Sequence, residues 1–110
     1  MENAIMTETT IIEQIKQKIA HHPIILFMKG SPETPRCGFS ARDVQILNAC
    51  GVTFASVDVL ENPAIRQYLP EVSSWPTFPQ LFVQGELIGG CDIMTELYEN
   101  GELEKILTGH

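Results

Sequence analysis

One cysteine of this 110-residue chain stands where a thiol can do chemistry. Cys37 opens the tetrapeptide Cys37-Gly38-Phe39-Ser40, after a loop that begins at Lys29 and is rich in Gly and Pro. The run from Ala41 to Gly51 predicts a helix closed by its C-terminal glycine. We therefore expect Cys37 at a loop-to-helix junction, where free N–H groups and the positive end of the helix dipole stabilise a thiolate.

The stabilisation that a helix end gives to a thiolate is too small to activate this thiol by itself. A free thiol is only about 3% thiolate at neutral pH. A helix end contributes about 0.3–1 kcal/mol, which is usually less than one pKa unit. Lys29 and Arg36 are the cations expected to supply the rest. The alternative is that Cys37 is a small buried apolar side chain, but its loop, its position and its basic neighbours favour a reactive thiol.

The residue three positions after Cys37 limits the chemistry. A dithiol redox motif needs a second cysteine there, and this chain has Ser40. A serine cannot close a disulfide. Cys37 must therefore react with a thiol from elsewhere: a small molecule, another protein or a second copy of the chain.

Composition and charge bound the remaining possibilities. The chain is 44% hydrophobic, which suits one domain with an ordinary core. Its net charge is -7, from 14 acidic and 7 basic residues, and it has no basic cluster, which argues against nucleic-acid or anionic-membrane partners. The first eight residues lack the apolar segment of a secretory signal. Three cysteines without paired spacing favour a reducing cytoplasm.

The hydrophobic pattern predicts an α/β order of elements. The expected elements are a helix over 10–21 that starts at a capping box of Thr10 and Glu13, a buried strand over 24–28, the helix after Cys37, a strand over 52–59, a helix that starts at Asn62-Pro63 and ends at Pro70, a hairpin of strands 80–83 and 86–88, a helix capped by Asp92, and a short helical turn over 103–107. A βαβ crossover followed by a hairpin builds a four-stranded mixed sheet with helices on both faces.

A second informative stretch lies at residues 75–79. Pro76 and Pro79 bracket two residues immediately before a strand. A cis X–Pro bond at such a turn would leave the N–H and C=O of Phe78 free to pair with an extended peptide. The following Gly89-Gly90 pair would let a ligand approach the backbone closely.

Several polar side chains admit a structural and a functional interpretation. His21 and His22 are either metal ligands or the end of a helix, and the helix end is favoured because adjacent residues do not share a helix face. Cys50 is favoured as a packed small residue. Arg66, taken by itself, is favoured as a solvated helix residue.

The motifs together resemble one family. Lys29-Gly30, Cys37 to Ser40, Trp75 to Pro79 and Gly89 to Asp92 occur in this order, and the chain resembles a monothiol glutaredoxin of the CGFS class in its single-domain form. The resemblance implies a single glutaredoxin domain over 1–110, with a folded core at about 10–107. It also implies a thioredoxin fold with a cis Pro79.

The resemblance further implies a glutathione site. Lys29 and Arg66 would bind the glycine carboxylate, and the Phe78 backbone would pair with the cysteinyl portion. Cys91 and Asp92 would hold the γ-glutamyl end, with Asp92 facing its ammonium group. These charges complement the two ends of glutathione.

The resemblance implies, finally, a bound [2Fe–2S] cluster with Cys37 as the protein's metal ligand. Such a cluster normally takes four thiolates, which two chains and two glutathione molecules would supply in a homodimer. BolA-like proteins and iron–sulfur acceptor proteins are the implied partners. The alternative function is a glutathione-dependent thiol-disulfide oxidoreductase that uses a mixed disulfide of Cys37 with glutathione. A redox-inert interaction domain is the third possibility.

Overall fold

The computed structural model describes residues 8–109. Its elements are the helices α1 (Glu8–His21), α2 (Gly38–Ala49), α3 (Pro63–Ser73), α4 (Cys91–Glu99) and α5 (Glu102–Thr108), and the strands β1 (Ile24–Met28), β2 (Ala55–Asp58), β3 (Gln80–Val83) and β4 (Glu86–Gly89). The strands form one sheet in the order β2-β1-β3-β4. β1 pairs with β2 in parallel and with β3 antiparallel, and β3 pairs antiparallel with β4. The predicted mixed four-stranded sheet is therefore confirmed.

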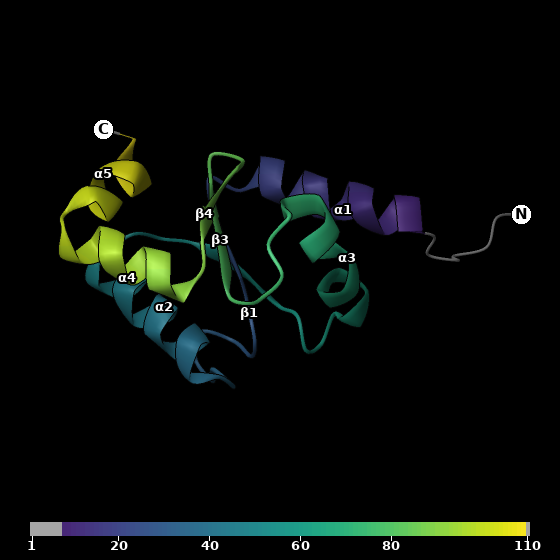
Figure 1. The fold of residues 1–110 in the computed structure, drawn as a ribbon, viewed down its shortest axis with the longest axis horizontal. Helices are drawn as coiled ribbons and strands as arrows, with labels where there is room; N and C mark the ends of the chain where they lie inside the picture. Colours follow the sequence, from purple (N-terminus) through teal and green to yellow (C-terminus); the bar gives the residue numbers. More distant parts are fainter. Residues whose placement is uncertain (1–7, 110) are drawn as a thin grey trace, which may run out of the picture.

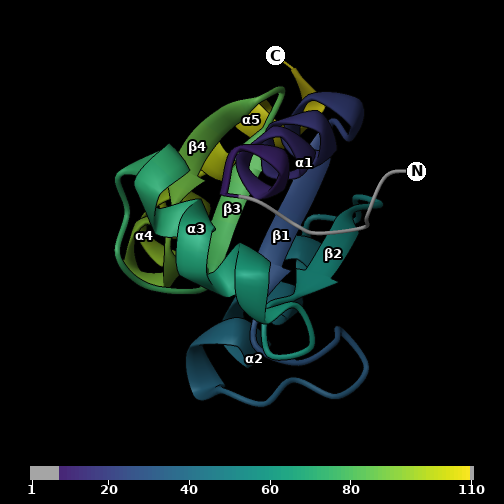
Figure 2. The ribbon, with the colours of Figure 1, turned by 90° about the vertical axis from the view of Figure 1, so that its right-hand side faces the viewer.

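The sheet lies between two layers of helices. α1 and α3 cover one face, and α2, α4 and α5 cover the other (Figure 1). Seen from the side that carries α1 and α3, the strands β1 and β3 lie behind these helices (Figure 2). Both faces of β1 are covered, which is why this strand is apolar at every position instead of alternating.

β1 divides its side chains between two cores. Leu26 and Met28 pack toward α2, α4 and α5, whereas Ile25 and Phe27 pack toward α1 and α3. Phe27 also meets Phe82 of β3 edge to face, with ring centroids 5.7 Å apart. The strand that leads into the Cys37 loop is thus fixed from both sides.

Some predicted boundaries are confirmed, and others shift. The hairpin turn lies at Gln84 and Gly85, which have φ of 52° and 81°, as a type I′ turn requires. α2 begins three residues earlier than the predicted helix. β2 is shorter than predicted, and Val52 and Phe54 pack against the core from outside the strand.

Two predicted helix caps are wrong. α1 includes Glu8, so Thr10 lies inside the helix and not at its N-cap. Ile11 is buried in the core on the α1–α3 side of the sheet, and the helix begins before the predicted capping box. At α4 the N-cap is Gly90, in extended conformation, and Asp92 is the second helical residue. Its carboxylate still lies in the first turn, where it favours the helix dipole.

The predicted end of α3 at Pro70 is also wrong. The helix continues to Ser73 and ends at Ser74, which adopts φ of 57°. Pro70 cannot donate a hydrogen bond to the Arg66 carbonyl one turn back. Arg66 lies on the exposed side of α3, where water can bond to that carbonyl, so the helix tolerates the proline.

None of the helices between residues 8 and 109 has both the length and the apolar character needed to cross a bilayer.

Candidate thiol site

Cys37 is the N-cap residue of α2. Its backbone is extended, with φ of −156° and ψ of 138°, and its side chain is half-buried. The loop before it folds back on the end of β1, because the Arg36 N–H donates to the Lys29 carbonyl at 2.8 Å and Gly30 bridges to Pro35. The predicted loop-to-helix position of the thiol is confirmed.

Gly30 allows this loop to turn sharply. It adopts φ of +94°, and a Cβ atom built there would lie 2.5 Å from the Thr34 carbonyl oxygen. The Gly30 N–H donates to Asp58 Oδ1 at 3.0 Å, and the Leu60 N–H donates to the same oxygen at 2.9 Å. Asp58 at the end of β2 therefore anchors the thiol loop, a role that the sequence pattern did not reveal.

The environment of Cys37 lowers the pKa of its thiol. Burial acts in the opposite direction, but the N–H groups of Ser40 and Phe39, the Ser40 hydroxyl and the Lys29 charge together outweigh it. These N–H groups face the sulfur without closing a side-chain cap hydrogen bond. Lys29 lowers the pKa as expected, although it contributes least of these groups, and Arg36 is not among the groups that shift it.

Ser40 has a structural role in addition to replacing a second thiol. Its side chain is fully buried, and its Oγ accepts a hydrogen bond of 3.0 Å from the Lys29 N–H. The first turn of α2 is thereby tied to the end of β1.

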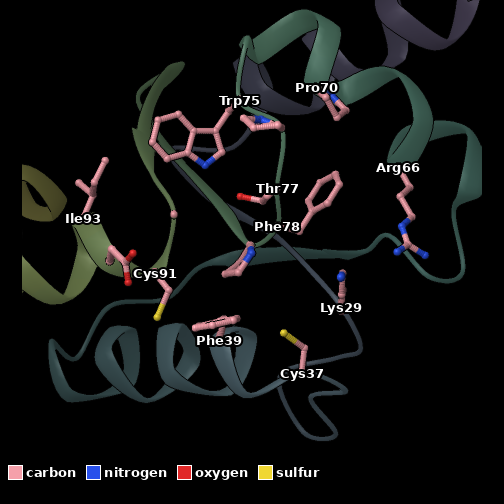
Figure 3. A pocket seen from close by; sticks show the side chains of 14 residues that line it. Lys29, Cys37, Phe39, Arg66, Pro70, Trp75, Thr77, Phe78, Cys91 and Ile93 are labelled. Carbon is pink, nitrogen blue, oxygen red and sulfur yellow. The ribbon is translucent and has the colours of Figure 1, made fainter.

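A pocket of about 580 Å³ opens beside Cys37. All six residues predicted for the site line it: Lys29, Cys37, Arg66, Phe78, Cys91 and Asp92. Figure 3 shows Arg66 and Lys29 at one end and Cys91 at the other, with Cys37 and Phe39 along the α2 side. The volume is typical of a small-molecule site. The fold therefore brings together residues from positions 29 to 92 of the sequence.

The far wall of the pocket is the segment before β3. The Phe78–Pro79 peptide bond is cis, as the resemblance implied. Between residues 8 and 109, no other backbone group bonds to the Phe78 N–H or C=O. The fully buried Gln80 holds this segment, because its Nε2 donates to the carbonyls of Trp75 at 2.9 Å and Thr77 at 3.1 Å. The sequence analysis missed Gln80, which a strand pattern does not distinguish.

Gly90 packs closely against other parts of the protein. A Cβ atom at this position would lie 3.2 Å from both the Pro79 carbonyl oxygen and Trp75 Nε1. The sequence analysis expected a ligand to approach the backbone closely at the glycine pair. In the structure the Trp75 ring, which also lines the pocket, lies close to Gly90. Trp75, Phe39 and Pro70 are lining residues to which the sequence analysis gave no role.

Cys91 lies at the opposite end of the pocket from Lys29, with its Sγ 4.0 Å from Thr95 Oγ1. Burial raises the pKa of its thiol, and the nearby carboxylate of Asp43 raises it further. Asp43 belongs to α2 and is fully buried. Burial raises the pKa of Asp43 to about 7, against smaller opposing effects of Cys91 and Arg42.

The remaining polar candidates lie away from the pocket. Cys50 packs against the core, as predicted, and burial raises its pKa. His21 ends α1, in agreement with the helix-end interpretation. In the described part of the chain, no three His, Cys, Asp or Glu side chains gather as a metal site.

A thiol at the N-terminus of the helix after β1, facing a cis-proline segment, defines a thiol protein of thioredoxin fold. Residues 24–88 match the glutaredoxin family. Among curated relatives, Glutaredoxin 4 of Escherichia coli K12 is 59% identical over 99 residues, covering 90% of this chain and 86% of that protein. The probable monothiol glutaredoxin 2 of Rickettsia felis is 55% identical over 104 residues, covering 94% of this chain and all of that protein.

Solved structures agree with the fold. Reduced apo GrxS14 of poplar has a TM-score of 0.80 and 46% identity, with 92% of this chain and 93% of that chain covered. A buckwheat glutaredoxin–glutathione complex has a TM-score of 0.82 at 24% identity, with 93% and 91% covered, and shows the fold alone. The chain belongs to the glutaredoxin family, and its relatives identify it as a monothiol member.

Proposed function

We propose that this chain is a CGFS-class monothiol glutaredoxin of the cytoplasm, which binds glutathione in the pocket and carries a [2Fe–2S] cluster between two copies of itself. One observation carries the proposal. Cys37 has a lowered thiol pKa and lines a pocket that is also lined by Lys29, Arg66 and Asp92, and no second thiol follows at position 40.

The charges around the pocket suit glutathione. This tripeptide carries a carboxylate at its glycine end and both an ammonium and a carboxylate at its γ-glutamyl end. Lys29 and Arg66, together at one end of the pocket (Figure 3), would bind the glycine carboxylate. Asp92, a lining residue next in sequence to Cys91, would bind the ammonium. The two ends of the pocket would then differ in charge, and this difference would fix the direction in which the peptide binds.

The backbone of the pocket suits an extended peptide. The N–H and C=O of Phe78 have no other backbone partner within residues 8–109, so they can pair with the cysteinyl portion of the ligand. Gln80 holds the carbonyls on the preceding residues and so keeps this segment in place. A glutathione sulfur held there would meet Cys37.

The cluster, as cargo, fits a shared site better than a site within one chain. A [2Fe–2S] cluster normally takes four thiolates. Cys37 of each copy and one glutathione from each copy would supply them. Phe39, next to Cys37 and 61% exposed, offers an apolar surface for the second copy. BolA-like and iron–sulfur acceptor proteins are the proposed partners for transfer.

The lowered pKa of Cys37 also favours a second candidate, a glutathione-dependent thiol-disulfide oxidoreductase. The Cys37 thiolate would attack the glutathione sulfur of a protein–glutathione mixed disulfide. A Cys37–glutathione disulfide would form as the protein thiolate leaves. Free glutathione would then attack that disulfide, release glutathione disulfide and restore Cys37.

Anaerobic reconstitution with iron and sulfide, with and without glutathione, tests the proposal. We expect a visible [2Fe–2S] chromophore that needs glutathione, elutes at the mass of a dimer and is lost in Cys37→Ser. Cys50→Ser is the matched control, because Cys50 lies outside the pocket, and should retain the chromophore. Glutathione binding without a chromophore under any condition would contradict cluster carriage and favour the oxidoreductase.

A further inference from the structure

The two cations that line the pocket come from segments that are remote in sequence. Lys29 follows β1, and Arg66 lies in the first turn of α3. Both side chains lie at the same end of the pocket (Figure 3). Among residues 8–109, neither of them forms an ion pair with a carboxylate. Both cations are therefore available to a ligand, and no ion pair within this part of the chain sets the spacing between them.

Asp58 is bonded to both of the segments that carry these cations. It ends β2, and its Cα pairs with that of Met28 in the parallel register of β1 and β2. Its Oδ1 accepts the N–H of Gly30, the residue after Lys29, at 3.0 Å. The same oxygen accepts the Leu60 N–H at 2.9 Å. One carboxylate oxygen thus joins the start of the thiol loop to the connection between β2 and α3.

The backbone of Asp58 continues this link to the start of α3. Its carbonyl accepts a hydrogen bond of 2.9 Å from Asn62 Nδ2. Asn62 is the N-cap residue of α3, and its own carbonyl accepts the Arg66 N–H at 3.0 Å. A chain of hydrogen bonds centred on Asp58 therefore runs from the residue after one cation to the backbone of the other.

We propose that Asp58 is a positioning residue for the cationic end of the pocket, and that it sets Lys29 and Arg66 at the spacing that a single ligand carboxylate requires. Asp58 acts through these two residues, because it does not itself line the pocket. Its Oδ1 is occupied by two backbone N–H groups, and charge-assisted hydrogen bonds of this kind are strong. Because the carboxylate is held by backbone donors and pairs with neither cation, it leaves both cations to the ligand.

This role rests on the proposed function, because it concerns the end of the pocket that would bind the glycine carboxylate of glutathione. Groups that are already held in place bind a ligand more tightly than groups that must be ordered on binding. Loss of the Asp58 carboxylate should therefore weaken the recognition of the glycine carboxylate in particular. A general loosening of the fold would instead weaken the binding of every ligand alike.

The experiment compares two ligands that differ only at this end. In glutathione amide, a neutral carboxamide replaces the glycine carboxylate. The dissociation constants of both reduced ligands are measured by NMR chemical-shift titration of the full chain. We expect the parent to bind glutathione about tenfold more tightly than the amide, and Asp58→Ala to reduce this ratio to about threefold or less.

Three further variants show whether the acceptor or the charge of Asp58 matters. Asp58→Asn keeps an oxygen that can accept the same N–H groups, so it should retain most of the ratio. The matched control is Glu61→Ala, which removes an exposed carboxylate from the same connection and should keep the parent ratio. Asn62→Ala removes the link to α3 and serves if Asp58→Ala does not fold. It should lower the ratio about twofold, and the Asn62 side chain makes no cap hydrogen bond to α3 that would be lost with it.

The outcomes separate the role of Asp58 from the proposed function. A parent that binds neither ligand, or binds both equally, would contradict the proposed glutathione site and this role with it. A parent ratio of about tenfold that is unchanged in the folded Asp58→Ala and Asn62→Ala variants would overturn the role of Asp58 and leave the proposed function in place. An equal fall of the ratio in Glu61→Ala would also overturn it, because the loss of one negative charge would then explain the effect.

Discussion

The buried Ser40 hydroxyl oxygen accepts a 3.0 Å hydrogen bond from the backbone N–H of Lys29. This bond joins the end of β1 to the first turn of α2, where Cys37 lies. The Ser40 hydroxyl and N–H also lower the pKa of Cys37. One side chain therefore contributes both to the geometry of the thiol and to its ionisation.

Ser40→Ala should destabilise the fold and reduce the reactivity of Cys37. Loss of the hydroxyl leaves the half-buried Lys29 N–H without its partner, which costs about 1–3 kcal/mol. The thiol pKa should rise, because a group that lowers it is removed. Urea denaturation and the pH profile of Cys37 alkylation measure the two effects. Ser56→Ala on the exposed side of β2 is the control, and an unchanged alkylation midpoint in Ser40→Ala would contradict this role.

Lys29→Gln should change the thiol pKa less than Ser40→Ala does. The charge of Lys29 contributes less to the lowered pKa than the Ser40 hydroxyl, which Ser40→Ala removes. Its removal should instead weaken glutathione binding, since the ammonium is proposed to hold a carboxylate. Calorimetric titration with glutathione measures that loss, expected at about tenfold. A larger pKa change in Lys29→Gln than in Ser40→Ala would show that the cation dominates.

Asp43 should make the stability of the protein depend on pH. Burial raises its pKa from 3.8 to about 7, so the folded chain binds this proton more tightly than the unfolded chain. Stability should therefore fall as pH rises from about 4 to 7. Asp43→Ala removes this fall. The free energy of unfolding of the variant, relative to that of the parent, should therefore increase by about 2–4 kcal/mol between pH 4 and pH 8. Urea denaturation at several pH values tests this, and a constant difference would contradict it.

Gly30→Ala should disrupt the thiol loop, whereas Gly38→Ala should not. At Gly30 a Cβ atom meets the Thr34 carbonyl oxygen at 2.5 Å, and the backbone has φ of +94°. At Gly38 nothing lies within 4 Å, and alanine is the better helix former. We expect Gly30→Ala to cost about 2 kcal/mol or more and Gly38→Ala less than about 1 kcal/mol. Equal thermal stability of the two variants would contradict the packing described at Gly30.

Gln80→Leu should weaken glutathione binding although Gln80 does not line the pocket. The substitution removes the donors that hold the Trp75 and Thr77 carbonyls, so the segment that carries Phe78 loses its support. We expect about a tenfold loss of affinity by calorimetric titration. Gln84→Leu, in the exposed hairpin turn, is the control and should bind normally. Normal binding by Gln80→Leu would show that the cis-proline segment is held by other contacts.

Several elements could be predicted because their signals are local. The apolar run at 24–28 predicted the central strand, the Gln84-Gly85 pair predicted the hairpin, and the position of Cys37 before a helix predicted an activated thiol. Each of these depends on neighbouring residues alone. Two local signals for helix ends failed: α3 continues through Pro70, and α1 begins before Thr10.

Which other residues support the site depends on how the elements pack together. Asp58 anchors the thiol loop from a strand remote in sequence, and Asp43 raises the pKa of Cys91 from another helix, whereas Gln80 holds the cis-proline segment that directly precedes it. Their residue types are ordinary for a strand or a helix, so no pattern marks them. Sequence spacing can place a thiol at a helix end, but burial and the sign of the facing charge depend on how the layers pack. In this protein the charge of Lys29 lowers the pKa of Cys37, whereas the carboxyl of Asp43 raises the pKa of Cys91.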